Sequence, residues 1–203
     1  MSNHYYSEHP FVEHDRKLIT ASLRGITLKF VTDAGVFSKG GIDYGSRLLI
    51  ETMEAADGSD VLDMGCGYGP IGLFAAALWP RSTVTMVDKN SRAVDLAWEN
   101  ARMNGLKNVR VMQSDLYAGV AQDTFDTVLT NPPIRAGKSV VFQIYEGAVE
   151  RLKPGGELWV VIQKKQGAPS TLAKLESLFV SVSEVNKSKG YWILRAVKAK
   201  ENG

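Results

Sequence analysis

Apolar and polar residues alternate along residues 24–31, and this alternation places Ile26, Leu28 and Phe30 on one face. A period of two is typical of a strand that is buried on one side only. We expect this strand to form a hairpin with residues 16–22.

After this hairpin, segments of helical spacing alternate with short apolar runs. The first helix is predicted to begin at Asp43, whose carboxylate suits an N-cap, and to run toward Ala56. Further helices are expected at residues 71–78, 91–103, 139–152 and 170–178. Strands are expected at residues 61–64, 83–87, 109–113, 125–130 and 157–163, followed by a hairpin of 180–187 and 191–197 around Lys189-Gly190.

Repeated strand–helix units with short connections require parallel strands in a sheet that is covered on both faces. The sequence therefore predicts an α/β, doubly wound fold: a seven-stranded, mostly parallel sheet with a C-terminal antiparallel hairpin and a small N-terminal β extension. We expect one domain over 1–203, with an N-terminal arm and hairpin in 1–40 and the core in 41–203. Ligands of such folds bind beyond the carboxyl ends of the strands, so the residues that follow each strand are the candidates for a site.

Composition narrows the class of protein. The 203 residues are 44% hydrophobic and 23% charged, with a net charge of +2, so a strong, sequence-independent grip on nucleic acid is not implied overall. The single Cys66 excludes a framework of disulfides and is typical of a reducing cytoplasm. No apolar run approaches the ~18 residues of a membrane span, and the N-terminus lacks the apolar core of a signal peptide. We expect a cytoplasmic protein without a membrane partner.

The histidines and tryptophans limit the chemistry further. All three histidines lie in the first 14 residues with a spacing of five, which suits neither one helix face nor a zinc finger, so no metal site is expected. A histidine general base is equally disfavoured. The positions concerned are His4, His9 and His14. Trp79, Trp98 and Trp159 occupy apolar positions of their predicted elements, and we expect them in the core.

A glycine-rich turn, VLDMGCGYGPIG (residues 61–72), follows the first strand of the predicted sheet. Its glycines allow a tight turn and a close approach of the backbone to a ligand, and the next helix offers free N–H groups. Residues 67–72 also match GxGxxG, and Asp88 ends the next strand 19 residues after Gly69, where an acid accepts ribose hydroxyls. A Walker loop is excluded because no Gly-Lys-Ser/Thr follows. Several adenosine cofactors stay open on this evidence.

Asp63, just before the glycines, distinguishes between these candidate cofactors. The pyrophosphate of a dinucleotide would meet an unwanted negative charge there, whereas a cationic amino group and a sulfonium would be attracted. Asp115 ends the third strand in QSDLY and offers a further acceptor, suited to an adenine amino group. Acidic residues at three consecutive strand ends, together with GxGxG, favour a ligand site over three separate turn caps.

The segment LTNPPIRAG (residues 129–137) ends an apolar run with Asn131-Pro132-Pro133. Asn-Pro is a common turn dipeptide, and alone it would indicate only the end of a strand. Proline has a fixed φ and no N–H, so the segment presents an amide side chain beside backbone carbonyls that only accept hydrogen bonds. In this type of fold it lies at the same sheet edge as the three acids, which favours a catalytic role.

In this order, VLDMGCGYG, Asp88, Asp115 and NPPI resemble the class I S-adenosylmethionine-dependent methyltransferases, which have a Rossmann-like fold. Three longer segments are similar to the catalytic domain of the small-subunit ribosomal RNA guanine-N2 methyltransferases: GVFSKGGIDYGS (35–46), NPPIRAGK and LKPGGELWVVIQ. The resemblance covers about residues 20–197. It implies methyl transfer from S-adenosyl-L-methionine to an exocyclic amino group, foremost guanine N2 in ribosomal RNA or another RNA.

The resemblance also implies roles for individual residues. The methionine end of the cofactor would contact Asp63 and the glycine loop, the ribose would contact Asp88, and the adenine would contact Asp115. Asp43 and Gly45 would support the opposite wall. The expected cofactor-binding residues are Phe37, Ser38, Asp63, Gly65, Cys66, Gly67, Gly69, Asp88, Lys89, Asp115 and Leu116.

An exocyclic amine is a poor nucleophile because its lone pair is delocalised into the ring. If the side-chain oxygen of Asn131 and the carbonyl of Pro132 accept its N–H bonds, the nitrogen moves toward tetrahedral geometry and the lone pair becomes available. Proline aims such a carbonyl through its fixed φ. We expect Asn131, Pro132 and Pro133 to be the catalytic residues.

Two features depart from the family. An aromatic residue that stacks on the base usually follows NPP, whereas this chain has Ile134, so another side chain such as Phe37 would have to compensate. The best-known relatives carry a second, degenerate copy of the domain, so we expect this chain to form a homodimer or to bind its substrate differently. The expected substrate contacts are Ile134, Arg135, Lys138 and Lys164.

Three alternatives stay open at this point. Adenine N6 or a protein glutamine also presents a planar amine that Asn131 could hold. An NAD-dependent oxidoreductase is allowed by GxGxxG and disfavoured by Asp63. A cofactor-binding module without catalysis is disfavoured by the intact Asn131-Pro132-Pro133.

Overall fold

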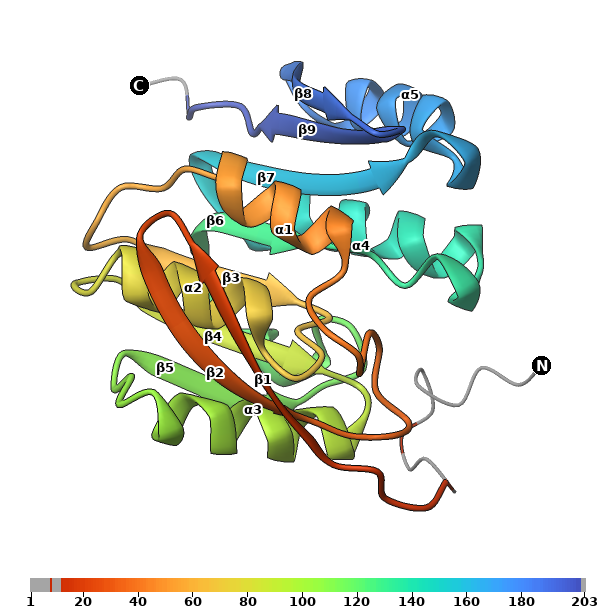
Figure 1. Ribbon diagram of the computed structural model, residues 1–203. Helices are drawn as coiled ribbons and strands as arrows, with labels where there is room; N and C mark the ends of the chain where they lie inside the picture. The colour runs from red at the N-terminus through yellow and green to blue at the C-terminus, as the bar shows by residue number, and fades with distance from the viewer. Residues whose placement is uncertain (1–7, 9–11, 202–203) are drawn as a thin grey trace.

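A seven-stranded sheet with the strand order β5-β4-β3-β6-β7-β9-β8 runs through the protein (Figure 1). The computed structural model describes Glu8 and residues 12–201, so His4 and His9 lie outside the described residues. β3 to β7 pair in parallel, whereas β9 pairs antiparallel with both β7 and β8. The strands are β3 (Asp60–Met64), β4 (Thr83–Asp88), β5 (Val109–Gln113), β6 (Phe125–Thr130), β7 (Leu152–Gln163), β8 (Ser181–Ser188) and β9 (Tyr191–Val197).

Helices cover both faces of the sheet, as its parallel strands require. One face packs against three helices and the N-terminal hairpin, and the other packs against two helices, each with its own apolar cluster. The first set is α1 (Tyr44–Thr52), α2 (Pro70–Leu78) and α3 (Ser91–Met103), and the second is α4 (Lys138–Arg151) and α5 (Ala168–Leu178). The predicted α/β, doubly wound fold with a C-terminal antiparallel hairpin is confirmed.

The boundaries differ from the prediction at α1, which ends at Thr52 rather than near Ala56, at β7 and at three short 3-10 turns. β7 begins at Leu152 rather than at residue 157. Residues 153–156 also belong to this strand, although its pairing with β6 shifts register between Phe125 and Thr127. The unpredicted turns are Ala118–Val120, Ile134–Ala136 and Lys164–Gln166. Ile134–Ala136 follows β6 after Asn131-Pro132-Pro133, and Lys164–Gln166 follows β7 directly, so both lie at the edge of the sheet where a ligand would bind.

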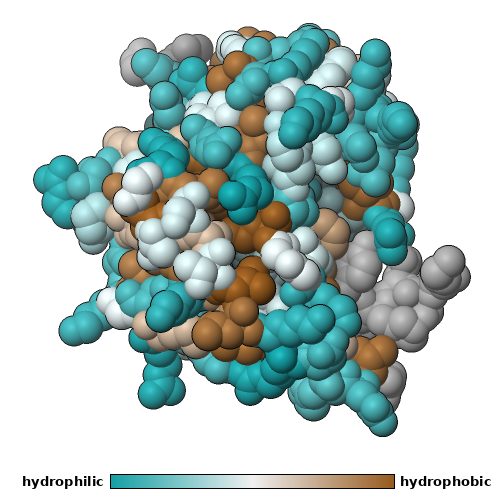
Figure 2. Space-filling model, in the orientation of Figure 1, coloured by the Kyte–Doolittle hydropathy of each residue, from teal (hydrophilic) through white to brown (hydrophobic). Residues whose placement is uncertain are grey.

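The N-terminal hairpin, β1 (Lys17–Leu23) and β2 (Ile26–Thr32), forms a separate two-stranded sheet that lies across α2 and α3 (Figure 1). Buried Asn100 of α3 joins it to the core. Its side-chain amide donates to the carbonyls of Val31 at 3.0 Å and Tyr68 at 2.8 Å, and its oxygen accepts the N–H of Val31 at 2.7 Å. In Figure 2, apolar residues gather in the middle of the face where the hairpin, α1 and α2 meet.

The expectation that Trp98 lies in the core is wrong, because 46% of its surface is exposed, whereas Trp79 and Trp159 are buried as predicted. The buried face of α3 includes Asn100. This residue is polar, but its side-chain oxygen and nitrogen both form hydrogen bonds, with the hairpin and with Tyr68. The buried stripe is therefore turned away from Trp98. A hydrophobicity pattern that counts Asn100 as polar misplaces this stripe.

No helix within Glu8 and residues 12–201 is long and apolar enough to cross a membrane.

Replacing Asn100 by Ala should lower the free energy of unfolding by about 2–4 kcal/mol, because three backbone groups would lose their buried partner. Trp98→Ala is the control, and it should cost less than about 1 kcal/mol, since this side chain is half exposed. Urea unfolding of both variants checks the ranking. Equal losses would show that the hairpin does not depend on Asn100.

Candidate active site

A pocket of about 260 Å³ lies at the carboxyl ends of β3 and β6, where the strand order reverses. The chain continues from β3 toward β4 on one side and from β6 toward β7 on the other, so the two loops diverge and leave a crevice. The expected site residues that line it are Phe37, Ser38, Gly65, Cys66, Gly67, Asp88, Lys89, Leu116, Asn131, Pro132, Pro133, Ile134 and Arg135. The expected residues outside its lining are Asp63, Gly69, Asp115, Lys138 and Lys164.

The glycine loop after β3 is held by the end of the neighbouring strand. The N–H groups of Gly65 and Cys66 both donate to the carbonyl of Val87 at 2.9 Å, and the N–H of Gly67 donates to Oδ2 of Asp88 at 2.8 Å. Gly65 and Gly67 have φ angles of 75° and 56°, in the left-handed region that glycine tolerates best. The loop therefore presents backbone, rather than side chains, to the pocket.

Asp63 is fully buried beneath this loop, next to Met64, which lines the pocket. Its Oδ2 accepts the N–H of Gly72 at 2.8 Å, while its Oδ1 has no hydrogen-bond partner among the described residues. Burial, together with the charge of Asp88, raises the pKa of Asp63 to about 7, although the Gly72 hydrogen bond opposes the shift. A buried, half-partnered carboxylate favours a cationic group nearby.

The acids after β4 and β5 differ in their placement. Asp88 lines the pocket, and burial raises its pKa. Asp115 is exposed and lies 3.3 Å from the ammonium of Lys89, measured at its Oδ2, while its neighbours Ser114 and Leu116 line the pocket. Asp115 is thus set at the outer rim, where Lys89 holds it.

The loop before α1 forms the opposite wall. Phe37 is 46% exposed and lines the pocket beside Ser38, whose φ of 58° marks a tight turn closed by its hydroxyl, which donates to the carbonyl of Gly41. The hydroxyl of Tyr68 donates to the carbonyl of Ser38 at 3.4 Å. This bond joins the wall to the glycine loop.

Asn131 follows β6, and its orientation is fixed by the start of α1. Its amide nitrogen Nδ2 donates to Oδ2 of Asp43 at 3.3 Å and to Oγ of Ser46 at 3.0 Å. A carboxylate only accepts hydrogen bonds at neutral pH, so this pair assigns the nitrogen and the oxygen of the amide without ambiguity. Within the described part of the chain, Oδ1 of Asn131 accepts no hydrogen bond, which leaves it as an acceptor for a ligand.

Pro132 and Pro133 follow Asn131 at the same wall of the pocket. Pro133 begins a 3-10 turn in which its carbonyl accepts the N–H of Ala136 at 2.9 Å, whereas the carbonyl of Pro132 accepts no hydrogen bond from residues 8 or 12–201. Pro132 is buried and Asn131 is half-buried, and both line the pocket. Two unpartnered acceptor oxygens therefore belong to consecutive residues at one wall of the pocket.

Asp43 was expected only to cap α1 and to support the wall. It does cap the helix, because its Oδ2 accepts the N–H of Ser46 at 3.1 Å, and the same oxygen also accepts from Asn131. Sequence reasoning missed Ser46, Tyr68 and Tyr191, which also line the pocket. A hydroxyl one turn beyond a predicted N-cap was the available signal for Ser46.

The described residues hold no group of three or more His, Cys, Asp and Glu side chains that could bind a metal ion. His14 is bonded to the buried carboxylate of Asp33. Lys138 starts α4, with its ammonium 5.0 Å from the ring centroid of Phe142. Lys164 follows β7, and its N–H donates to the carbonyl of Gly190 at 2.7 Å.

Comparison with known proteins identifies the family and several relatives. Residues 27–195 match the family model of the methyltransferase small domain. Uncharacterized protein YbxB of Bacillus subtilis is 53% identical over 200 residues, which cover 98% of this chain and 100% of that protein. Ribosomal RNA large subunit methyltransferase G of Streptomyces avermitilis is 33% identical over 170 residues, or 81% of this chain and 44% of the relative.

A solved structure matches almost the whole fold. The 16S rRNA N2 G methyltransferase RsmC of T. thermophilus, in complex with AdoMet and guanosine, superposes with a TM-score of 0.82 at 28% identity, over 93% of this chain and 52% of that one. The fold is thus the Rossmann-like fold of class I S-adenosylmethionine-dependent methyltransferases. The chain spans about half the length of the named ribosomal RNA methyltransferases, and the full length of YbxB.

Asp63 should make the free energy of unfolding depend on pH. Its pKa is raised from 3.8 to about 7 in the folded chain, so the folded chain binds more protons between these values and loses stability as the pH rises through them. Between pH 5 and pH 8 the ligand-free chain should lose about 2.5 kcal/mol that Asp63→Asn does not lose, at about 1.4 kcal/mol per pKa unit. Urea unfolding of both proteins at both pH values measures the difference, and parallel pH profiles would contradict it.

Proposed function

Because the chain belongs to the methyltransferase small domain family, we propose that it transfers a methyl group from S-adenosylmethionine to an exocyclic amine, namely guanine N2 in ribosomal RNA. The observation that carries this proposal is the fixed amide of Asn131, whose oxygen is left as an acceptor beside the carbonyl of Pro132. Two of the relatives named above are ribosomal RNA methyltransferases, and one of these two acts at N2 of a guanosine.

The pocket suits the cofactor on three counts. Asp63 is buried behind the pocket lining, where its negative charge attracts a cationic amino group, and the glycine backbone leaves room for a ligand at close range. Asp88, at the end of β4, is an acceptor in the place that a ribose occupies in such folds. When bound, the cofactor supplies an electrophilic methyl group on a positively charged sulfur.

The chain's own residues act on the amine. Oδ1 of Asn131 and the carbonyl of Pro132 accept its two N–H bonds, which hold the nitrogen in place and free its lone pair for the new N–CH₃ bond. These fixed acceptors also stabilise the positive charge that develops on nitrogen. The bond from the methyl group to sulfur would break as the N–CH₃ bond forms, leaving S-adenosylhomocysteine, and the extra proton of the product amine would pass to solvent water, so no histidine base is needed.

Residues in and around the pocket support the proposal that the substrate is RNA. Ile134 and Arg135 line the pocket directly after the catalytic turn, and exposed Lys138 and Lys164 follow the strands at the same edge. Lysine and arginine at such positions suit phosphate contacts. Three expectations from the sequence remain predictions. They are that residues 1–203 form one domain, that the chain forms a homodimer, and that it acts in the cytoplasm.

Ribosomal RNA from a strain that lacks this gene is the test substrate. Incubation with the protein and radioactive S-adenosylmethionine, followed by digestion to nucleosides, should yield labelled N2-methylguanosine. Labelled N6-methyladenosine would move the target to adenine. Label on a protein glutamine with none in RNA would refute the RNA substrate.

Asn131→Ala should lower kcat by about 100-fold or more, the typical cost of removing one preorganised group at a reacting centre. The affinity for S-adenosylhomocysteine, measured by calorimetry, should stay within about threefold, since the other pocket walls are intact. Unchanged turnover would remove Asn131 from the mechanism.

Asp43 should act as a positioning residue for Asn131, and Asp43→Ser isolates this role. Serine still caps α1, but it is too short to accept from the amide of Asn131, which is then able to turn its nitrogen toward the substrate. We expect a fall of about tenfold in kcat with little change in cofactor affinity or melting temperature. Asp43→Asn, which keeps an oxygen at the same place, should recover most of the rate. Equal rates for the serine variant and the parent would exclude the positioning role.

A further inference from the structure

Ile134 stands where the family resemblance implies a stacking aromatic, and a different aromatic residue lines the same pocket. Tyr191, the first residue of β9, lines the pocket together with Asn131 and Ile134, although 60 residues separate it from Asn131 in the sequence. We propose that Tyr191 is the surface on which the target base stacks, and that the neighbouring Lys189 holds a phosphate of the same RNA. This inference rests on the proposed function and extends it to the mode of substrate binding.

The ring of Tyr191 is fixed by the same helix turn that fixes Asn131. A Cβ on Gly45 would lie 2.9 Å from Cε1 of Tyr191, so the ring rests directly on the α1 backbone. Glycine is otherwise unfavourable inside a helix, and this close packing accounts for it. Ser46, the next residue, accepts from Asn131. The first turn of α1 therefore sets the distance between the aromatic ring and the catalytic amide.

Two further contacts keep the ring in place. Tyr44, on the same turn, lies 5.5 Å from Tyr191 between ring centroids at 51°, and the hydroxyls of Tyr44 and Ser188 are hydrogen-bonded at 2.7 Å. The backbone of Tyr191 pairs with β7 at Gln163 and with β8 at Ser188. A half-buried aromatic held from three sides loses little freedom on binding, which suits a stacking surface.

Lys189 occupies a backbone position that lysine disfavours. It forms a tight turn with Gly190, and their φ angles are 48° and 80°. Asn and Asp are the usual residues at the first position of such turns. The side chain of Lys189 is exposed, and its positive charge distinguishes it from the residues usual at this position.

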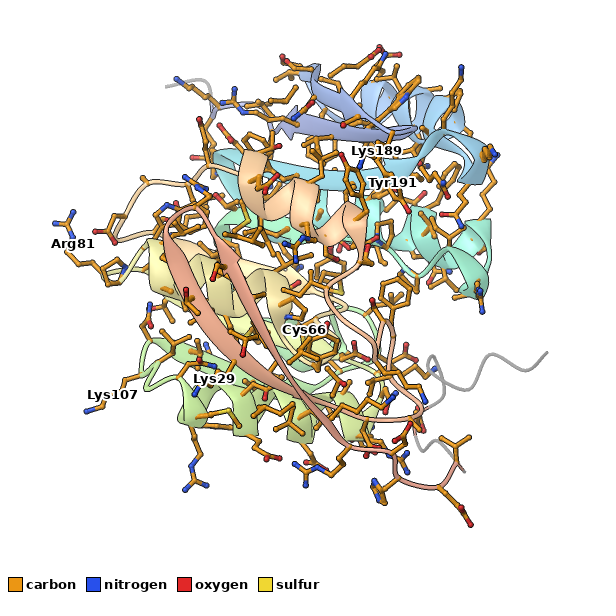
Figure 3. The ribbon with its side chains drawn as sticks, viewed as in Figure 1. Lys29, Cys66, Arg81, Lys107, Lys189 and Tyr191 are labelled. Atoms are coloured by element: carbon orange, nitrogen blue, oxygen red, sulfur yellow. The ribbon has the colours of Figure 1, made fainter. Side chains whose placement is uncertain are left out.

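The ammonium of Lys189 is placed where it could bind the phosphate next to a base stacked on Tyr191. Its ammonium lies 4.8 Å from the ring centroid of Tyr44, which in turn contacts Tyr191. The carbonyl of Gly190 accepts the N–H of Lys164, so this exposed lysine lies beside the same turn. Figure 3 shows Lys189 and Tyr191 together near the N-terminal end of α1, while Lys107 projects on the opposite side of the view.

A base stacked on Tyr191 would have its exocyclic amine near the acceptors of Asn131 and Pro132. Phe37 is another aromatic residue that lines the pocket, and it is exposed on the wall formed by Ser38 and the glycine loop. That wall is joined to the cofactor side through Tyr68. Tyr191 is instead joined through Gly45 and Ser46 to Asn131, and this connection favours it over Phe37 as the base platform.

Steady-state methylation of the ribosomal RNA described above tests the stacking role. Tyr191→Leu should raise the KM for RNA by about tenfold, in the range of losing one stacked base, while S-adenosylhomocysteine affinity and melting temperature stay close to those of the parent. Tyr191→Phe keeps the ring and should recover most of the affinity. Phe37→Leu should weaken cofactor binding instead.

Two outcomes would overturn the stacking role. One is an unchanged KM in Tyr191→Leu, and the other is a rise in the KM for RNA that appears only in Phe37→Leu. If the parent protein methylates no RNA at all, the proposed function fails, and this result is distinct from both.

The phosphate contact has its own readout. Lys189→Asn removes the charge and keeps a residue that tolerates the turn. The slope of log affinity for RNA against log salt should become shallower by about 0.7, the value for one phosphate contact to a single strand. Lys107→Asn, the same change on the far side, should leave the slope at that of the parent. Equal slopes for the two variants would refute the contact at Lys189.

Discussion

The parallel pairing of β3 with β6 is the constraint from which the site follows. Met64 pairs with Thr130 at the ends of these strands, and the hydroxyl of Thr130 donates to the carbonyl of Met64 at 3.0 Å. The next residues are therefore Gly65 on one strand and Asn131 on the other, side by side at one sheet edge. Because the chain turns in opposite directions after the two strands, a crevice opens where the glycine loop faces Asn131.

Much of this arrangement could be predicted from the sequence, because it depends on local patterns. Period-two and helical spacing located the strands and helices, and a strand end followed by glycines or by Asn-Pro-Pro marks a sheet edge. Asn100 shows where the pattern failed, since a buried polar residue that bonds to another element looks exposed in sequence. The adjacency of Tyr191 to Asn131 was also out of reach, because it depends on β9 lying beside β7, and no local signal encodes the order of strands in a sheet.

Buried acids link the fold to the ligand. Asp63 is held by one hydrogen bond, and its pKa is raised to about 7, so in the ligand-free chain its charge opposes folding near neutral pH. A sequence selected for stability alone would place an apolar residue there. Under the proposed function, the charge of a cationic ligand would stabilise this carboxylate, and the cost to the ligand-free fold would be recovered on binding.

The first turn of α1 contacts both Asn131 and Tyr191, the two residues that we propose hold the amine and the base. Its Asp43 and Ser46 orient the amide of Asn131, and its Gly45 seats the ring of Tyr191. The family resemblance implies an aromatic residue directly after NPP, so that one segment would both stack the base and hold its amine. Here Ile134 leaves that segment without a stacking ring, and α1 instead couples the catalytic turn to a strand from the C-terminal hairpin. The spacing between base and acceptors would then be set by helix packing rather than by one loop, which makes it less sensitive to the conformation of residues 134–137.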